Sequence, residues 1–294
     1  MENVIQQDGT GNFYLHGQNV TKAVMGILVS GTMKNFDYSD PLLAILVFAI
    51  ETASEAAEIH KSDLEEDFLN MDGMCPEKIR HFLNNICSNT EIFNGVRNYF
   101  EVGCGTGSTY ISSNFKTSLN TSVVCDKFCE GKLGPDGKKV FLDNCKKYLK
   151  NIPENLITDS CFDVDLSSFK DKINLFLFDG PHEVEDHEKS LTYFEPIFDD
   201  RIIVMIDDWN DYRVQAGTIL GLSKINYEVV FWRYNAANMQ IGQFSGLYLP
   251  RAEVQMDRLS EDRAAVRGYS NKFGDPYRWH NGFMTMILRK RGAK

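Results

Sequence analysis

The sequence lacks the features that mark secreted or membrane-spanning proteins. Its seven cysteines are an odd number, none form a CxxC pair, and histidines at zinc-binding spacing from them are missing. These absences argue against a disulfide framework and a structural zinc site, and favour reduced thiols in a cytoplasmic protein. Residues 1–20 lack the basic start and apolar middle of a signal peptide. The longest apolar run, residues 42–50, is about half a membrane span, so we expect no membrane association.

Basic residues are also scarce, with 31 Lys and Arg against 41 Asp and Glu and a net charge of −10. This balance disfavours broad contact with nucleic acid, because such contact needs basic side chains to neutralise phosphates. The sequence has no internal repeat and no low-complexity linker. Its 294 residues are enough for one large domain with a helical addition. A homo-oligomer is compatible with these properties.

The chain divides by pattern into two parts. Residues 1–97 are expected to form an N-terminal helical region that packs on the core, with helices near 23–29, 41–60 and 76–87. Pro41 follows Ser39-Asp40 at a favourable first helical position. The remainder, 98–294, is expected to form the catalytic domain.

Strands and helices alternate throughout this second part. The predicted strands are 98–102, 121–125, 155–158, 173–178, 201–206, 226–232 and 283–290. The predicted helices lie near 107–116, 138–150, 184–197 and 211–223. Continuous apolar runs such as residues 175–178 and 202–206 are typical of parallel strands that are buried on both faces. The pattern predicts a doubly wound, Rossmann-like α/β fold, with seven strands that are mostly parallel and an antiparallel last strand.

A glycine-rich segment follows the first predicted strand of this part. Glu101 lies in the strand, and glycines stand at 103, 105 and 107. Glycines allow a tight turn from a strand into a helix and a close approach of a ligand to the backbone. A dinucleotide-binding GxGxxG motif would need its third glycine at Ser108, so the pattern here is ExGxGxG instead.

ExGxGxG resembles motif I of the class I S-adenosylmethionine-dependent methyltransferases. The resemblance implies that the loop holds the methionine part and the ribose, and that Asp126 binds the ribose hydroxyls. It also implies adenine contacts after the third strand. The implied cofactor-binding residues are Glu101, Gly103, Cys104, Gly105, Gly107, Asp126, Asp159, Ser160 and Asp179. A generic strand–helix turn or a site for another nucleotide are the alternatives for this loop.

Acidic residues also end the fourth and fifth predicted strands. Asp179 begins an Asp-Gly-Pro-His segment that ends at His182, and Asp207 and Asp208 follow the next strand. Ligands of open α/β sheets lie beyond the carboxyl ends of the strands. Three carboxylates in one crevice repel each other unless they are protonated or bind a cation, and Mg²⁺ suits carboxylate ligands.

This arrangement resembles the metal-dependent sugar O-methyltransferases of macrolide biosynthesis, which have a DGxH segment followed by paired acids. The resemblance implies that Asp179, Asp207 and Asp208 bind Mg²⁺ and that His182 is the catalytic base. The first paired acid is often Glu in those enzymes, whereas Asp207 stands here. Asn210 is therefore an alternative ligand, as in the catechol-type relatives.

Simpler interpretations exist for the same residues. Asp179 could cap the following helix, His182 could begin that helix without a chemical role, and Asp208 could hydrogen-bond only to neighbouring groups. His187 lies five residues beyond His182, a poor spacing for one helix face, and we expect it to be a solvated surface residue.

A long insertion, residues 233–282, separates the last two predicted strands and is rich in aromatic residues. It is a candidate acceptor wall, because Tyr and Trp stack well on sugar or aromatic rings. The leading hypothesis is a Mg²⁺-assisted O-methyltransferase for a small hydroxylated acceptor such as a sugar or glycan precursor. A metal-independent methyltransferase and a non-catalytic S-adenosylmethionine-binding protein are the alternatives, and methylation of nucleic acid is a weaker one.

Overall fold

The computed structural model describes residues 40–71, 73–128, 136–169, 172–235 and 282–293, together with the backbone of three short strands before them. These strands are β1 (Ile5–Gln7), β2 (Phe13–Leu15) and β3 (Gln18–Asn19), and they form an antiparallel sheet. They differ from the helical character expected for residues 1–97. The expected helix at 23–29 lies outside the described residues, and the proposed division into two parts stays a prediction.

The main sheet has seven strands and confirms the predicted Rossmann-like fold. The strands are β4 (Asn98–Val102), β5 (Thr121–Cys125), β6 (Asn155–Ile157), β7 (Ile173–Phe178), β8 (Phe198–Ile206), β9 (Tyr227–Asn235) and β10 (Phe283–Lys290). Their order is β6-β5-β4-β7-β8-β10-β9. Strands β4 to β8 pair in parallel, whereas β10 pairs antiparallel with both β8 and β9. The strand order reverses beside β4, where open α/β sheets bind ligands.

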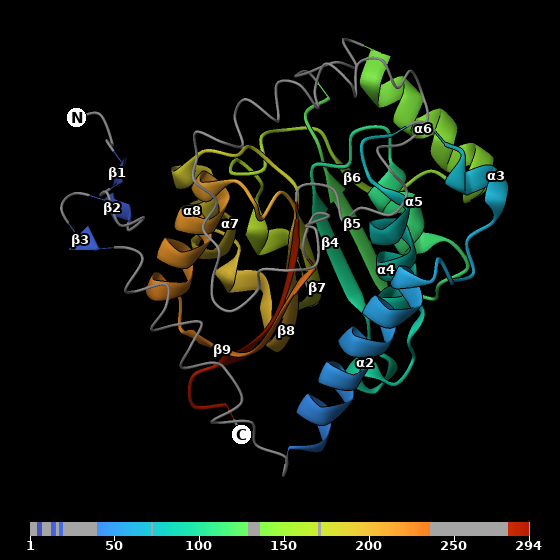
Figure 1. Cartoon of the computed structure of the whole chain (residues 1–294). Helices are drawn as coiled ribbons and strands as arrows, with labels where there is room; N and C mark the ends of the chain where they lie inside the picture. The colour runs from blue at the N-terminus through green and yellow to red at the C-terminus, as the bar shows by residue number, and fades with distance from the viewer. Residues whose placement is uncertain are drawn as a thin grey trace.

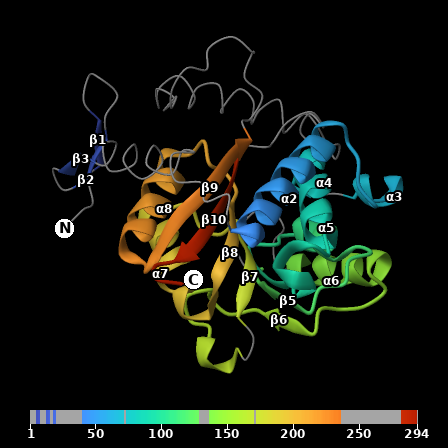
Figure 2. The same cartoon turned by 90° about the horizontal axis from the view of Figure 1, so that it is seen from below.

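Helices cover both faces of this sheet, as Figures 1 and 2 show. One layer contains α2 (Pro41–Glu58), α4 (Glu77–Ser88), α5 (Ser108–Asn114) and α6 (Gly137–Tyr148), and the other contains α7 (Val184–Thr192) and α8 (Tyr212–Lys224). Among the described residues there are also short helical turns: α3 (Glu66–Leu69), Ile92–Gly95, Leu166–Ser168 and Glu195–Ile197. Burial of both faces explains why every residue of β7 is apolar or buried.

The buried side chain of Arg80 stabilises the connection between α2 and α4. Arg80 is fully buried in α4, and its guanidinium donates hydrogen bonds to the carbonyl oxygens of four residues in this connection. These acceptors are Phe68, Leu69, Met71 and Cys75, at 2.9 to 3.3 Å. The five donors of arginine suit such a role. The connection passes close to the glycine-rich segment, since a Cβ at Gly73 would lie 2.8 Å from the Ser108 hydroxyl oxygen.

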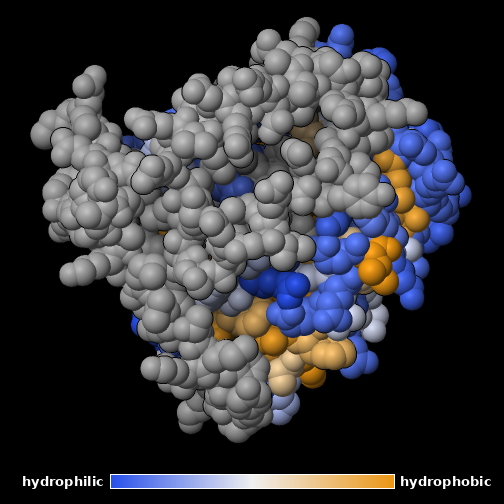
Figure 3. Space-filling model, in the orientation of Figure 1, coloured by the Kyte–Doolittle hydropathy of each residue, from blue (hydrophilic) through white to orange (hydrophobic). Residues whose placement is uncertain are grey.

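Helix α2 also carries apolar surface. Phe48 is 72% exposed and Ile59, which follows the helix, is 70% exposed. Figure 3 shows an orange area where α2 lies in Figure 1. Nevertheless, among the described residues no helix combines the length and the apolar character needed to cross a bilayer.

Candidate active site

The glycine-rich segment turns β4 into α5, and two of its glycines are required by their surroundings. Gly103 has a φ of +84°, and a Cβ there would lie 1.8 Å from the carbonyl oxygen of Asp179. Gly107 caps α5 with a φ of +97°, and a Cβ there would lie 2.9 Å from the ring of Phe141. The loop therefore packs against the end of β7 in a conformation that other residues rarely adopt.

Glu101 lies beneath this loop, with no exposed surface. Its carboxylate accepts hydrogen bonds from the Tyr99 hydroxyl at 2.6 Å and from the Thr109 hydroxyl. Burial raises the pKa of Glu101 to about 8. Glu101 thus connects β4 to α5 and supports the loop from within, and a direct contact with a cofactor stays a prediction.

Asp126 follows β5 and lies beside the same loop. Its Oδ2 accepts hydrogen bonds from the backbone amides of Cys104 at 2.9 Å and Gly105 at 2.8 Å, and its Oδ1 accepts one from the amide of Phe128. A carboxylate has about four acceptor positions, and backbone amides of described residues fill three of them. The structure brings together the loop and the acid predicted for the ribose.

Asp159 and Ser160 follow β6, the neighbouring edge strand. Asp159 is exposed, and its carbonyl oxygen lies 3.7 Å from the Cys125 sulfur, which donates to it. Asp159 also lines a cavity of about 630 Å³ together with Phe169. Within the described part of the chain, the lining of this cavity does not include the glycine loop. The adenine contact predicted for these two residues remains a prediction.

A second group of polar side chains lies at the ends of β7 and β8. One ligand atom each from Asp179, His182 and Asp208 lies within 4.8 Å of the others. The Nε2 atom of His182 is 3.0 Å from Oδ2 of Asp208. Backbone hydrogen bonds join these strand ends to their neighbours. The amide of Asp179 donates to the Val102 carbonyl at the end of β4, and the amide of Asp207 donates to the Phe178 carbonyl at the end of β7. The structure thus joins two predicted metal ligands and the predicted base.

The backbone of Asp208 is strained in a way that aims its side chain. Its φ is +52°, a left-handed conformation that costs a residue with a Cβ roughly 1–2 kcal/mol. The amide of Trp209 donates to the Gly282 carbonyl at 3.0 Å, and the amide of Asp211 donates to the Asp208 carbonyl at 2.8 Å. These bonds hold the turn, and strain of this kind clusters at functional sites.

Electrostatics in this group favour an added cation. Burial, together with the charges of Asp207 and Asp208, raises the pKa of Asp179 well above its usual range. The hydrogen bond to Asp208 raises the pKa of His182. A positive charge beside these carboxylates would therefore reduce their mutual repulsion.

Asp207 and Asn210 occupy different positions from Asp208. Asp207 is buried, and among the described residues it does not belong to the group of ligand atoms that contains Asp208. Asn210 accepts a hydrogen bond from the Tyr234 hydroxyl of β9 through its Oδ1. The ligand roles of both residues stay predictions.

The expectation that His187 is a solvated surface residue is wrong. His187 is 1% exposed, and its ring packs edge-on against Phe178 at a centroid distance of 5.0 Å. Helix α8 approaches closely there, because a Cβ at Gly217 would lie 2.6 Å from the Cβ of His187. The spacing argument failed because α7 begins at Val184, so His182 is not on that helix.

His187 should make the folded protein sensitive to acid. Burial lowers its pKa to about 3, whereas an unfolded histidine has a pKa of about 6.5. Between these values the unfolded chain binds a proton that the folded chain does not, so stability falls as the pH falls. Between pH 7 and pH 5 this proton uptake lowers the free energy of unfolding by about 2 kcal/mol.

Urea unfolding of wild type and His187→Phe at both pH values measures this contribution. Phenylalanine keeps the ring volume but cannot bind a proton. The difference in unfolding free energy between pH 7 and pH 5 should be smaller in the variant by that amount. The same pH dependence in both proteins would show that His187 is not a source of acid sensitivity.

The predicted acceptor wall cannot be compared with the structure over most of its length. Residues 236–281, which make up most of the insertion, lie outside the described part. Of the seven cysteines, Cys129 also lies outside it. The other six are buried free thiols.

Comparisons with known proteins give structural neighbours only. No protein-family model matches the chain, and no curated protein matches it significantly. An O-methyltransferase from Bacillus cereus in complex with SAH has 10% identity and a TM-score of 0.48, and the match covers 83% of this chain and all of that one. Cofactor-bound Rv0187 from MTB has 11% identity and a TM-score of 0.45, over 90% and 95% of the two chains.

An SAH-bound methyltransferase from Podospora anserina, PaMTH1, has 12% identity and a TM-score of 0.43, over 87% of this chain and 97% of that one. Likeness at this level carries no argument about the activity of the present chain. Any functional conclusion therefore depends on its own residues.

Proposed function

We propose that the protein is a class I S-adenosylmethionine-dependent methyltransferase that, assisted by Mg²⁺, methylates an oxygen of a small hydroxylated acceptor, such as a sugar or glycan precursor. The observation that carries this proposal is the cluster of Asp179, His182 and Asp208 at the strand ends next to the glycine loop. A nucleotide loop and a general-base cluster at neighbouring strand ends suit a transfer between two bound molecules.

The residues around the loop fit S-adenosylmethionine. Gly103, Gly105 and Gly107 all have positive φ, a backbone conformation that gives the loop a tight turn and that glycine adopts most readily. Asp126 is partly exposed, so a ribose hydroxyl can reach its carboxylate. Bound there, the cofactor supplies an activated methyl group on a sulfonium. The protein's part is to orient this group toward the end of β7.

The cluster also fits Mg²⁺. Asp179 and Asp208 offer carboxylate oxygens within 4.8 Å of each other, and Mg²⁺ is usually held by one or two carboxylates with water and substrate oxygens. The pKa of Asp179, raised well above its usual range by burial and by the acids beside it, points to the same need for positive charge. When bound, Mg²⁺ would lower the pKa of a coordinated hydroxyl.

His182 is placed to remove the proton from the acceptor. It is partly exposed, whereas its partner Asp208 is buried, so the imidazole is the part of the pair that a substrate can reach. Asp208 occupies Nε2 and orients the ring, which leaves Nδ1 for the acceptor hydroxyl. Deprotonation makes the oxygen nucleophilic as it attacks the methyl group.

The same pair favours a second candidate, a methyltransferase that works without metal. A histidine oriented by a buried aspartate at 3.0 Å can act as a base on its own. The two candidates differ in the role of the carboxylate of Asp179, which is a ligand in the first and a neighbouring acid in the second.

Removal of divalent metal separates these candidates. We expect methyl transfer to a panel of sugars and phenols to fall by at least about 10²-fold in excess EDTA, because an acceptor hydroxyl is then a poor nucleophile. Added Mg²⁺ should restore the rate. The measurement is methyl transfer from labelled S-adenosylmethionine, and full activity in EDTA would support the metal-independent candidate.

A further inference from the structure

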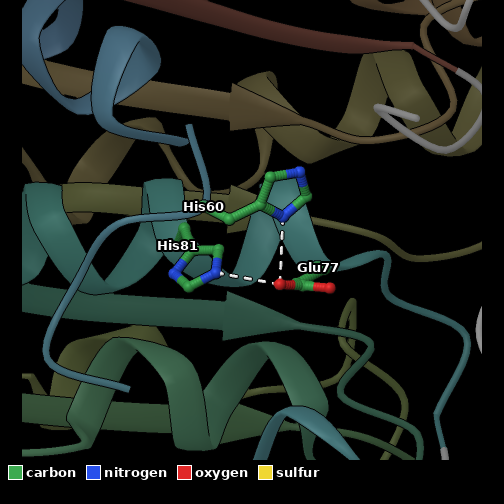
Figure 4. A group of neighbouring side chains, drawn as sticks. All are labelled: His60, Glu77 and His81. Atoms are coloured by element: carbon green, nitrogen blue, oxygen red, sulfur yellow. Dashed lines mark hydrogen bonds and ion pairs between the residues drawn. The ribbon is translucent and has the colours of Figure 1, made fainter. Parts of the chain in front are cut away.

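A second cluster of titratable side chains lies where α2 meets α4, and it shares no residue with the group at the strand ends. His60 follows the end of α2, whereas Glu77 and His81 lie one turn apart on α4. Figure 4 shows both imidazole rings turned toward the same carboxylate oxygen. Nδ1 of His60 is 3.0 Å from Oε1 of Glu77, and Nε2 of His81 is 3.3 Å from it.

We infer that His60, Glu77 and His81 form a binding site for a divalent transition metal, with Zn²⁺ as the ion that fits best. Two imidazoles and one carboxylate are a ligand set that zinc uses with a water in the fourth position. One ligand atom from each residue lies within 4.8 Å of the others. The sequence argued against a zinc site built from cysteines and histidines. The present group contains no cysteine, so that argument does not apply to it.

Two of the three separations between ligand atoms match the edge length of a tetrahedral zinc site. Ligand atoms about 2.0–2.1 Å from zinc, at tetrahedral angles, lie about 3.3 Å from each other. The two measured separations, 3.0 and 3.3 Å, are close to that edge length. The side chains of His60 and Glu77 are 23% and 25% exposed, so water can reach a fourth position, whereas His81 is buried.

A hydroxyl on the far side of His81 orients this ring. The Oγ atom of Ser62 is 2.7 Å from Nδ1 of His81, and it also accepts a hydrogen bond from the Leu64 amide. A hydroxyl oxygen has a second acceptor position, which suits a proton on Nδ1 of His81. In that tautomer Nε2 presents a lone pair to the carboxylate of Glu77, and a cation between these two acceptors makes the contact favourable.

The segment that carries Ser62 is itself fixed to α4. The amide of Asp63 donates to the side-chain oxygen of Asn84 at 3.1 Å, and the side chain of Asn85 donates to the Lys61 carbonyl at 2.7 Å. The three ligands therefore stand on two anchored elements. A site of this kind loses little entropy when an ion binds, which favours affinity.

Zinc uptake by the full chain tests this site. All proteins carry Asp208→Asn, which removes a carboxylate from the other cluster of potential ligands, and are freed of metal with EDTA. Glu77→Gln removes one ligand, and Glu55→Gln is the matched control on the exposed side of α2. We expect Glu55→Gln to bind one more equivalent of Zn²⁺ than Glu77→Gln. Added Zn²⁺ should raise the melting temperature of Glu55→Gln by several degrees and leave that of Glu77→Gln unchanged.

Two further variants keep the test decisive if Glu77→Gln does not fold. His60→Asn should lose the same equivalent. Ser62→Ala keeps all three ligands but should weaken zinc binding by about 10-fold or more, because it removes the partner of His81. Co²⁺ should give visible bands without a thiolate charge-transfer band, which excludes the cysteines as ligands. Equal zinc uptake by Glu77→Gln and Glu55→Gln, or a thiolate band, would overturn the inference.

Discussion

Asp208→Asn should reduce methyl transfer by about 10³-fold or more while leaving cofactor binding nearly unchanged. The substitution removes the carboxylate that orients His182 at 3.0 Å, and general-base catalysis contributes 10²–10⁴-fold. It also removes one of the two clustered carboxylates proposed to hold Mg²⁺. Asparagine tolerates the left-handed backbone nearly as well as aspartate, so the turn at φ +52° is kept.

The measurement is the rate of methyl transfer together with the affinity for S-adenosylhomocysteine. Asp143→Asn is the control, because its exposed pair with Lys139 on α6 contributes little to stability and lies outside the cluster. Asp207→Asn adds information. The metal-dependent candidate with three acidic ligands predicts a severe loss for it too, whereas a His182–Asp208 pair acting alone does not. Wild-type activity in Asp208→Asn would refute the proposed base.

Gly103→Ala should destabilise the protein by about 3 kcal/mol or more and weaken cofactor binding strongly. Its Cβ would lie 1.8 Å from the carbonyl oxygen of Asp179, so β7 or the loop must move. The cost adds overpacking, typically 1–3 kcal/mol, to the roughly 1–2 kcal/mol of a left-handed non-glycine residue. A shift of Asp179 also moves the cluster that contains His182.

Gly95→Ala is a matched control for this prediction. Gly95 has a φ of +82°, close to the +84° of Gly103, but the nearest atom to its Cβ would be the Thr90 carbonyl oxygen at 3.6 Å. Only the backbone cost of roughly 1–2 kcal/mol should appear there. Urea unfolding and cofactor titration compare the two variants. Equal losses in both would show that the contact with Asp179 does not constrain the loop.

The sheet and the glycine loop could be predicted from the sequence because they depend on local signals. Apolar runs such as β7 and the spacing of Gly103, Gly105 and Gly107 are visible without tertiary contacts. The predicted ends of β7 and β8, at residues 178 and 206, agree with the structure, so Asp179 and Asp208 lie just beyond these strands as expected. Strand β8 begins three residues before its predicted range, where Phe198 pairs with Ile173 of β7. Strand β9 ends three residues after its predicted range, because its pairing with β10 continues to Asn235.

Other features depend on packing between distant elements and could not be predicted. His187 is buried because Gly217 lets α8 approach α7, a contact that no spacing in the sequence reveals. Asp208 belongs to the cluster with Asp179 and His182, whereas Asp207 does not. The left-handed backbone of Asp208, which gives the two side chains different directions, is not visible in the sequence. His60 meets Glu77 only because α2 ends beside the start of α4. The four-residue spacing of Glu77 and His81 was the one local signal for that cluster.

Calorimetric titration of S-adenosylhomocysteine, with and without Mg²⁺, tests the central claim most directly. Wild type should bind, whereas Gly105→Arg should not, because the arginine would fill the loop beside Asp126. Gly292→Arg is the control, since Gly292 also has a positive φ but has no atom within 4 Å of its Cβ position. It should bind as wild type does. No binding by wild type under either condition would contradict the proposed methyltransferase site.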